Sequence, residues 1–342
     1  MKILIGGDIA QGGTIGFCVD AFKAIGVEAE LFNYREHFRI SFLNKALNKF
    51  RKIPHYFGVS GLNKKLLEKT QDIRPDFVLL FKPILVMPKT VKKLTKLTKV
   101  FSWYPDYIPF TKTCSAYFYK SIPFYDCHFS FNFANVEELK KKGAKLSLFL
   151  PCAADPDYHT PIKASDEEKK ELGADVVFMG TYAKEKRSEY LERLCGDGYD
   201  IKIYGDDWER HPQSSCLWRK KCIQSKTLYG KDMSKIFNAS KIVLAFVREH
   251  NKETLACRTY EIPISGGFML HQRTAKTDEV FKEGEEAEFF GSYEELKKKI
   301  DFYLKNESLR EKMIQKGRER VLREDLFLHR VQRIIEVFKE LM

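Results

Sequence analysis

The chain has 342 residues, enough for two domains of ordinary size, and its 44% of apolar and 13% of aromatic residues exclude a disordered protein. No run approaches the ~20 consecutive apolar residues that span a bilayer. The net charge is +12, and residues 1–150 carry 24 basic against 12 acidic residues, which leaves 35 of each for the rest. This asymmetry is typical of contact with an anionic partner, although a merely solvated basic surface would look the same.

The N-terminal residues and the cysteines indicate where the protein works. Residues 1–8 predict a strand and a turn rather than a secretion signal, so we expect a cytoplasmic protein. Eight cysteines are scattered without a Cys-x-x-Cys pair, and we expect them to be reduced thiols.

Strands and helices alternate along the first half. Predicted strands cover residues 2–5, 28–32, 76–81, 100–103, 128–131 and 147–150, and predicted helices cover 16–25, 63–70, 88–97 and 136–142. Continuous apolar strands separated by helices indicate a parallel sheet covered on both faces. Residues 42–69 place an apolar stripe beside basic residues. That pattern fits either an interfacial helix on an anionic membrane at the inner face or a stripe that packs on the core of the protein.

Two loops of the first half carry candidate site residues. Gly12, Gly13 and Thr14 follow the first strand without the Gly-x-Gly-x-x-Gly fingerprint of dinucleotide-binding proteins. We expect them to line an acceptor, with a plain turn as the alternative. Asp106 follows a predicted buried strand, so its carboxylate could accept a proton from an acceptor hydroxyl, or it is a turn aspartate after proline.

The second half repeats the alternation after a Pro-rich linker at residues 155–165. Predicted strands cover 175–179, 200–204, 242–246, 268–270 and 288–290, with helices at 188–195, 231–238 and 293–304, the last capped by Ser292. From residue 307 the chain is predicted helical with breaks near Gly317 and 325–327. We therefore predict domains at 1–152 and 166–327, with a C-terminal helix at about 328–342 that packs back on the first.

The segment from Arg258 to Leu270 is the most informative one. We expect a short helix that starts at Arg258, carries Glu261 and ends at Gly266-Gly267. Glu253 lies eight positions before Glu261, a spacing that also arises by chance in so charged a chain. Arginine at a helix start favours phosphate, and a carboxylate accepts hydrogen bonds from ribose or sugar hydroxyls. A nucleotide-sugar combines both groups.

The second half resembles the spore-maturation-protein-like (CgeB-type) glycosyltransferases, which belong to the class called GT-B. The matching segments are 177–182 (Val-Phe-Met-Gly-Thr-Tyr), 203–208 (Ile-Tyr-Gly-Asp-Asp-Trp), 238–244 (Asn-Ala-Ser-Lys-Ile-Val-Leu) and 258–268. The resemblance implies an α/β fold of two doubly wound Rossmann-like domains facing across a cleft. It also implies a UDP-sugar or related donor in the C-terminal domain, an acceptor in the N-terminal one, no metal or other cofactor, and a place in polysaccharide biosynthesis.

Glycosyl transfer without a metal needs cations at the leaving diphosphate. We assign catalysis to Asp106, Glu253 and Arg258, and donor binding to Gly180, Thr181, Arg187, Gly205, Arg248, Arg258, Glu261, Gly266 and Gly267. Asp155-Pro-Asp157 is an Asp-x-Asp sequence, but it lies in the linker, so we expect no metal site. Three alternatives stay open: a nucleotide-sugar epimerase of the same fold, a nucleic-acid-binding module on the basic half, and a non-catalytic nucleotide-binding protein.

Overall fold

A computed structural model describes residues 1–9, 13–109, 113–224, 228–249, 252 and 254–342. These residues divide into two compact units. Unit 1 consists of Met1–Cys152 and Phe327–Met342, together with Lys252, and unit 2 consists of Ala153–Glu249 and Thr254–Leu326. The last helix of the chain therefore belongs to unit 1, with the N-terminal sheet.

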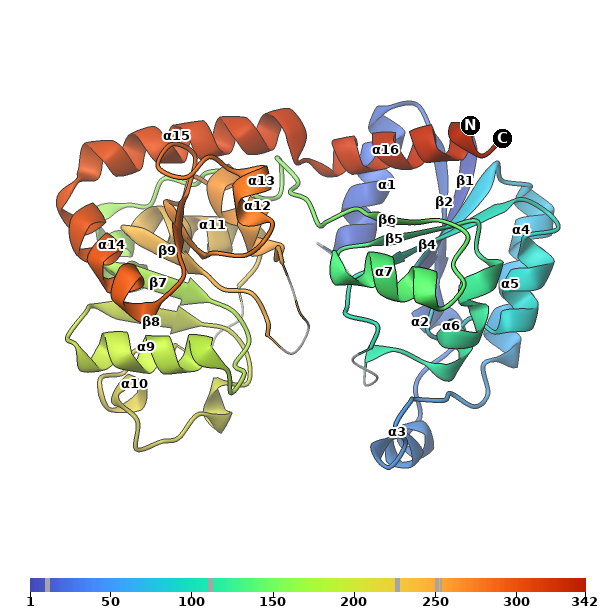
Figure 1. Ribbon diagram of the computed structural model, residues 1–342, viewed down its shortest axis with the longest axis horizontal. Coiled ribbons are helices and arrows are strands. Elements are labelled where there is room, and N and C mark those ends of the chain that lie inside the picture. The colour runs from blue at the N-terminus through green and yellow to red at the C-terminus, as the bar shows by residue number, and fades with distance from the viewer. Residues whose placement is uncertain (10–12, 110–112, 225–227, 250–251, 253) are drawn as a thin grey trace. The chain divides into compact units, whose positions relative to one another are not determined.

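The described part of unit 1 contains a parallel sheet of six strands in the order β2-β1-β3-β4-β5-β6 (Figure 1). The strands are β1 (Lys2–Gly7), β2 (Glu28–Asn33), β3 (Phe77–Phe81), β4 (Lys99–Tyr104), β5 (Cys127–Ser130) and β6 (Ser147–Phe149). All five residues of β3 are buried, as a central strand covered on both faces requires. This confirms the predicted parallel sheet.

Helices cover both faces of this sheet because successive strand residues point to opposite sides. On one face, the rings of Phe22 and Phe338 lie 6.4 and 5.0 Å from that of Phe77. On the other, Leu80 and Tyr104 share a core cluster with residues of five helices. The helices of unit 1 are α1 (Thr14–Ala24), α2 (Tyr34–His37), α3 (Phe42–Lys49), α4 (Ser60–Ile73), α5 (Pro88–Leu94), α6 (Ala116–Ser121), α7 (Ala134–Lys141) and α16 (Phe327–Glu340). The five that share the core cluster are α2, α4, α5, α6 and α7.

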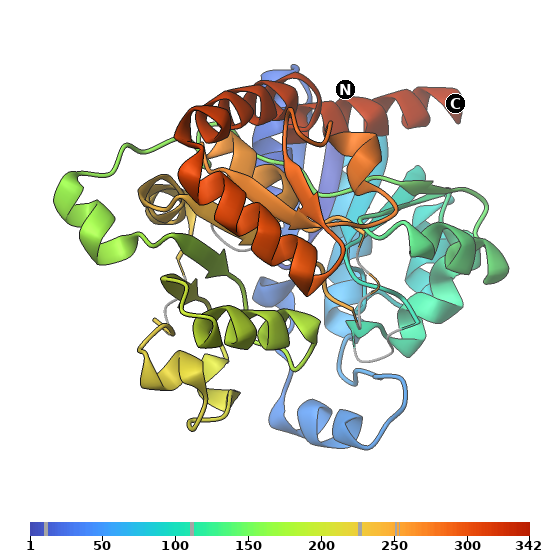
Figure 2. The ribbon, with the colours of Figure 1, turned by 60° about the vertical axis from the view of Figure 1, so that its left-hand side comes forward.

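The described part of unit 2 contains a parallel sheet of five strands in the order β11-β10-β9-β7-β8 (Figures 1 and 2). The strands are β7 (Val176–Met179), β8 (Ile201–Tyr204), β9 (Ile242–Ala245), β10 (Met269–Gln272) and β11 (Glu288–Phe290). The helices are α8 (Asp166–Leu172), α9 (Lys186–Gly196), α10 (Cys216–Arg219), α11 (Gly230–Ala239), α12 (Arg258–Ile264), α13 (Thr277–Val280), α14 (Tyr293–Lys305) and α15 (Glu307–Glu324). Both units are therefore Rossmann-like α/β folds, as predicted.

Local sequence signals predicted several helix boundaries correctly and one wrongly. Ser292 caps α14 by accepting a hydrogen bond from the Glu295 N–H, as expected. The break at 325–327 is present, between α15 and α16, but the break predicted near Gly317 is wrong because α15 runs through that residue. A Cβ atom at Gly317 would lie 2.4 Å from the Glu286 carbonyl oxygen. This glycine therefore serves close packing rather than helix termination.

The expectation of reduced thiols is wrong for one pair of cysteines. Cys195 on α9 and Cys216 on α10 form a disulfide, and the Cys222 sulfur lies 3.7 Å from that of Cys195. Residues scattered along the sequence can meet in space because α9 and α10 pack together. Among the described residues, no helix is long and apolar enough to cross a membrane.

Candidate functional site

The first turn of α12 is anchored to strand β10. The Thr259 hydroxyl accepts a hydrogen bond from the Ala256 N–H at 3.0 Å and lies 2.9 Å from His271 Nε2. His271 Nδ1 lies 2.6 Å from the Gln272 carbonyl oxygen, which can only accept. Nδ1 therefore carries the proton, and Nε2 accepts from Thr259. Burial lowers the pKa of His271 to about 4, so the ring stays neutral and keeps this arrangement at neutral pH.

Arg258 and Glu261 form an ion pair within that turn. The Glu261 side chain is only 13% exposed, and its second oxygen lies 3.7 Å from Nε2 of the buried His159. Burial and the nearby Arg258 lower the pKa of His159 to about 4. His159 is therefore neutral at pH 7, and Arg258 is the cation that pairs with Glu261. The guanidinium has five N–H donors, and Arg258 is 26% exposed, so it can hold Glu261 and still reach an anion.

Gly180 and Gly205 follow the ends of β7 and β8 and pack against each other. The Gly180 N–H donates to the Tyr204 carbonyl at 2.8 Å, and its own carbonyl accepts from Trp208 Nε1 at 2.9 Å. A Cβ atom at Gly205, whose φ is +142°, would lie 2.2 Å from the Gly180 oxygen. Glycine is needed here for the protein's own backbone, whether or not a ligand also approaches.

The two arginines expected to assist Arg258 differ in their surroundings. Arg187 is 6% exposed, and its guanidinium donates to the Thr181 carbonyl at 2.9 Å, with Glu185 at 3.6 Å. It therefore supports the turn after β7. Arg248 lies just beyond β9 and is half-buried. Since parallel strands all end at the same edge of a sheet, the turns after β7, β8 and β9 share the carboxyl edge at which α12 begins.

Gly266 and Gly267, which we expected to bind the donor, lie at the opposite end of α12 from Arg258. Gly266, at φ +82°, has Asn238 of α11 beside it, and a Cβ at Gly267 would lie 3.1 Å from the Val243 side chain near the start of β9. These positions mark the amino edge of the sheet. The two glycines close α12 and let it pack on β9. Gly12 and Glu253 lie outside the described residues.

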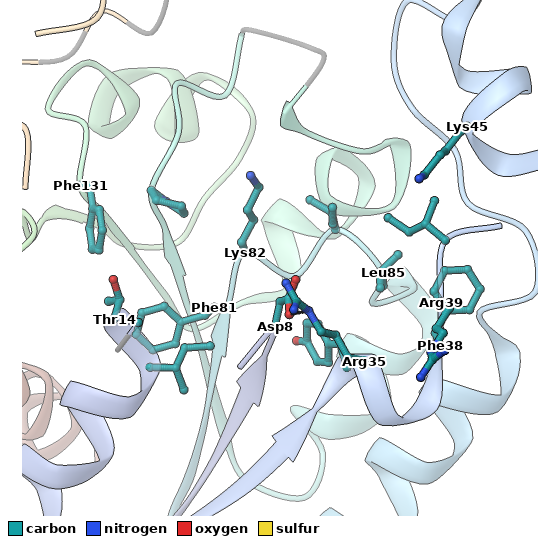
Figure 3. Close-up of a pocket in the computed structure, with 16 residues that line it drawn as sticks. Asp8, Thr14, Arg35, Phe38, Arg39, Lys45, Phe81, Lys82, Leu85 and Phe131 are labelled. Atoms are coloured by element: carbon teal, nitrogen blue, oxygen red, sulfur yellow. Dashed lines mark ion pairs between the residues drawn. The ribbon is translucent and has the colours of Figure 1, made fainter. Parts of the chain in front are cut away.

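Unit 1 contains a pocket of about 770 Å³ at the carboxyl ends of its strands (Figure 3). Gly13 and Thr14, expected on the acceptor side, are part of its wall. Four side chains in the wall are basic, and one, Asp8, is acidic and forms an ion pair with Arg35. The charged and apolar members of the wall include Asp8, Arg35, Arg39, Lys45, Lys82, Ile15, Phe38, Ile40, Phe81, Ile84, Leu85 and Phe131. Such a wall suits an anion joined to an apolar group.

Asp106 lies two residues beyond β4, next to this pocket. Its carboxylate pairs with Lys82 at 2.6 Å, so an ammonium group occupies lone pairs that a base would use. Asn135 holds the surrounding loop, because its Nδ2 donates to the Asp106 carbonyl at 2.7 Å and its Oδ1 accepts from the Ile108 N–H at 2.9 Å. Asp106 as a base stays a prediction, and it requires a ligand that displaces Lys82.

Sequence reasoning missed the residues that gather around these sites. Lys82 has a left-handed φ of +40°, which directs the chain away from β3. No local sequence pattern predicts this conformation. Arg35 and Arg39 follow β2, and their position after a strand was the available signal. His159 lies in the segment read as a linker, where Asp155 accepts hydrogen bonds from the N–H groups of Asp157 and Tyr158. The Asp-x-Asp sequence therefore forms its own turn.

In the described residues, no group of three His, Cys, Asp or Glu side chains could hold a metal ion.

Comparisons with known proteins agree with this architecture. The model of a family described as "Glycosyl transferase-like" matches residues 186–336, from the start of α9 into α16. A glycosyltransferase from Rickettsia africae is 15% identical, with a TM-score of 0.66 over 99% of this chain and 98% of that one. HepE from Anabaena in complex with UDP-glucose is 14% identical, with a TM-score of 0.67 over 99% of this chain and 100% of that one.

Two further findings complete these comparisons. A protein from Listeria monocytogenes described as a UDP-N-acetylglucosamine 2-epimerase is 14% identical, with a TM-score of 0.56 over 98% of this chain and 94% of that one. No curated protein matches the chain in sequence. The chain thus consists of two parallel-sheet Rossmann-like domains that match GT-B glycosyltransferase structures, and its second half carries a glycosyl transferase-like sequence pattern.

Proposed function

We propose that the protein is a glycosyltransferase that moves a sugar from a nucleotide-diphosphate donor to an acceptor without a metal. The observation that carries the proposal is the Arg258–Glu261 pair, fixed at the start of α12 inside the segment that the family model matches. Arg258 would bind the diphosphate, and Glu261 would accept hydrogen bonds from ribose or sugar hydroxyls. Several structural neighbours were solved with UDP or UDP-glucose, which supports a UDP-sugar donor. Within the class, the segments quoted above favour a CgeB-type enzyme.

The pocket of unit 1 favours a lipid-linked acceptor over a free glycan or a protein. Its cations Arg35, Arg39 and Lys82 suit a phosphate, while the apolar part of its wall offers nothing to sugar hydroxyls. A lipid phosphate presents both kinds of surface. Asp8 is in the pocket wall, and Asp106 pairs with Lys82 of that wall. A phosphate that draws Lys82 away from Asp106 would leave that carboxylate open to the acceptor hydroxyl.

Donor binding tests the assignment in unit 2. Calorimetry with UDP and UDP-sugars should show that Arg258→Gln weakens binding by about thirtyfold, the value of a charge-assisted hydrogen bond, and Glu261→Gln by about tenfold. Each single change leaves a partly buried charge without its partner, so the double variant R258Q/E261Q serves as the version with both charges removed. Unchanged nucleotide affinity in all three variants overturns the site.

Two controls separate the alternatives. Lys241→Gln removes an exposed ion pair with Asp175 at the amino edge of the same sheet, and we expect it to bind donor normally. Incubation with nucleotide-sugar alone should give slow hydrolysis to the nucleotide, whereas an epimerised nucleotide-sugar would assign the protein to the other activity of this fold. Turnover that survives EDTA is expected, and loss of turnover with EDTA contradicts the metal-free mechanism.

A further inference from the structure

Helix α3 has its polar side against the protein and its apolar side in solvent. Asn44, which is 4% exposed, accepts a hydrogen bond from the Phe57 N–H at 2.9 Å and donates to the Phe57 carbonyl at 3.2 Å. Asn48, one turn later, accepts from the His55 N–H at 2.9 Å. Two asparagines thus tie α3 to the loop segment 55–57. A helix that packs on a protein core shows the opposite orientation.

The outward side of α3 and the residues after it are apolar. Phe42 is 86% exposed, Phe50 is 88% exposed and Leu43 is 63% exposed, and Leu47, Ile53 and Phe57 are exposed as well. Figures 1 and 2 both show α3 standing out from the rest of unit 1. The stripe in residues 42–69 is therefore divided: Tyr56 and the residues of α4 pack on the core, whereas the apolar residues of α3 do not. A patch of this kind marks an interaction surface.

The charge around this patch has one sign. From residue 37 to residue 67 the chain contains seven basic residues and no acidic one. Lys49 lies 6.0 Å from the centre of the Phe50 ring, and Arg51 lies 5.3 Å from that of Phe57. Aromatic rings flanked by basic side chains suit the boundary between lipid headgroups and acyl chains, where the rings enter and the cations meet anionic lipid.

We propose that residues 38–57, the α3 arm, attach the protein to the surface of an anionic membrane. Phe42, Leu43 and Phe50 enter the headgroup region, and Lys45, Lys49, Arg51 and Lys52 contact lipid phosphates. The same arm contributes Phe38, Arg39, Ile40 and Lys45 to the wall of the unit 1 pocket, so the pocket adjoins the membrane-binding surface. Membrane attachment does not depend on the proposed transfer reaction and can be measured without it.

The test is sedimentation of the full chain with vesicles made of equal parts of phosphatidylcholine and phosphatidylglycerol, compared with phosphatidylcholine alone. The protein should bind the anionic vesicles and not the neutral ones. F42S/F50S should weaken binding at least about tenfold, because it removes the two largest exposed apolar side chains of the arm. K49Q/K52Q should weaken it by about fivefold per lysine, and added salt should do the same.

Matched variants make the result specific. Phe302→Ser removes a ring that is 50% exposed on α14 of unit 2, and K89Q/K93Q removes two exposed lysines of unit 1 outside the arm. Both should bind vesicles like the parent. Thermal unfolding should be unchanged in F42S/F50S because both rings are exposed. Equal binding of the parent and F42S/F50S overturns the proposal, and so does a parent that ignores vesicles but forms a dimer that F42S/F50S abolishes.

Discussion

Acid should destabilise unit 2 through its buried histidines, and His271 allows the effect to be isolated. Its ring is fully buried between Thr259 and Gln272, and burial lowers its pKa from 6.5 to about 4. Below pH 6.5 the unfolded chain takes up a proton at this ring, whereas the folded protein stays neutral down to about pH 4. The unfolded state therefore binds more protons in this window, so the free energy of unfolding falls as the pH falls.

The magnitude follows from the two pKa values. Between pH 7 and pH 5 the linkage relation gives a loss of about 2 kcal/mol for His271. His159 is also buried in unit 2 with a pKa of about 4, so the two together remove about 4 kcal/mol. That is a large part of the stability of an ordinary domain.

Tryptophan fluorescence can report on unit 2 alone. The chain has three tryptophans, of which only Trp103 lies in unit 1, so Trp103→Phe leaves Trp208 and Trp218 as probes. Urea unfolding of this variant at pH 7, 6 and 5 gives the parent's free energy of unfolding at each pH. Adding His271→Gln, which keeps an amide beside Thr259 but cannot ionise, should reduce the loss between pH 7 and pH 5 by about 2 kcal/mol. A loss as large as that of the parent would refute the reasoning.

Two further substitutions test packing. Gly317→Ala should lower the free energy of unfolding, measured in urea, by about 2 kcal/mol, because the new methyl group meets the Glu286 carbonyl. Helix propensity alone predicts a gain of about 1 kcal/mol. A more stable variant would show that α15 can shift away from that carbonyl. Asn135→Ala should lower the free energy of unfolding, measured by thermal unfolding, by about 2 to 3 kcal/mol, because it leaves the Ile108 N–H and the Asp106 carbonyl without this partner. A loss below about 0.5 kcal/mol would mean that water replaces the amide.

Much of the fold could be predicted from the sequence because its signals are local. A strand buried on both faces is apolar throughout, as β3 is, and a capping serine acts on a residue three positions away, as Ser292 does on Glu295. The start of α12 at Arg258 and its end before Gly266 follow from the same kind of signal. Alternation of such elements was sufficient to predict two parallel sheets.

The sequence alone therefore determined the strands of both sheets, most of the longer helices and the turns that carry charged residues. Only the tertiary structure decided what those residues contact. Arg187 donates to the Thr181 carbonyl, Gly317 leaves room for the Glu286 carbonyl, and Cys195 forms a disulfide with Cys216. It also gathered Arg35, Arg39 and Lys82 around one pocket and turned the apolar side of α3 toward solvent. The reason is physical: periodicity and capping act within a few residues of the chain, whereas burial and charge pairing depend on neighbours that only folding brings together.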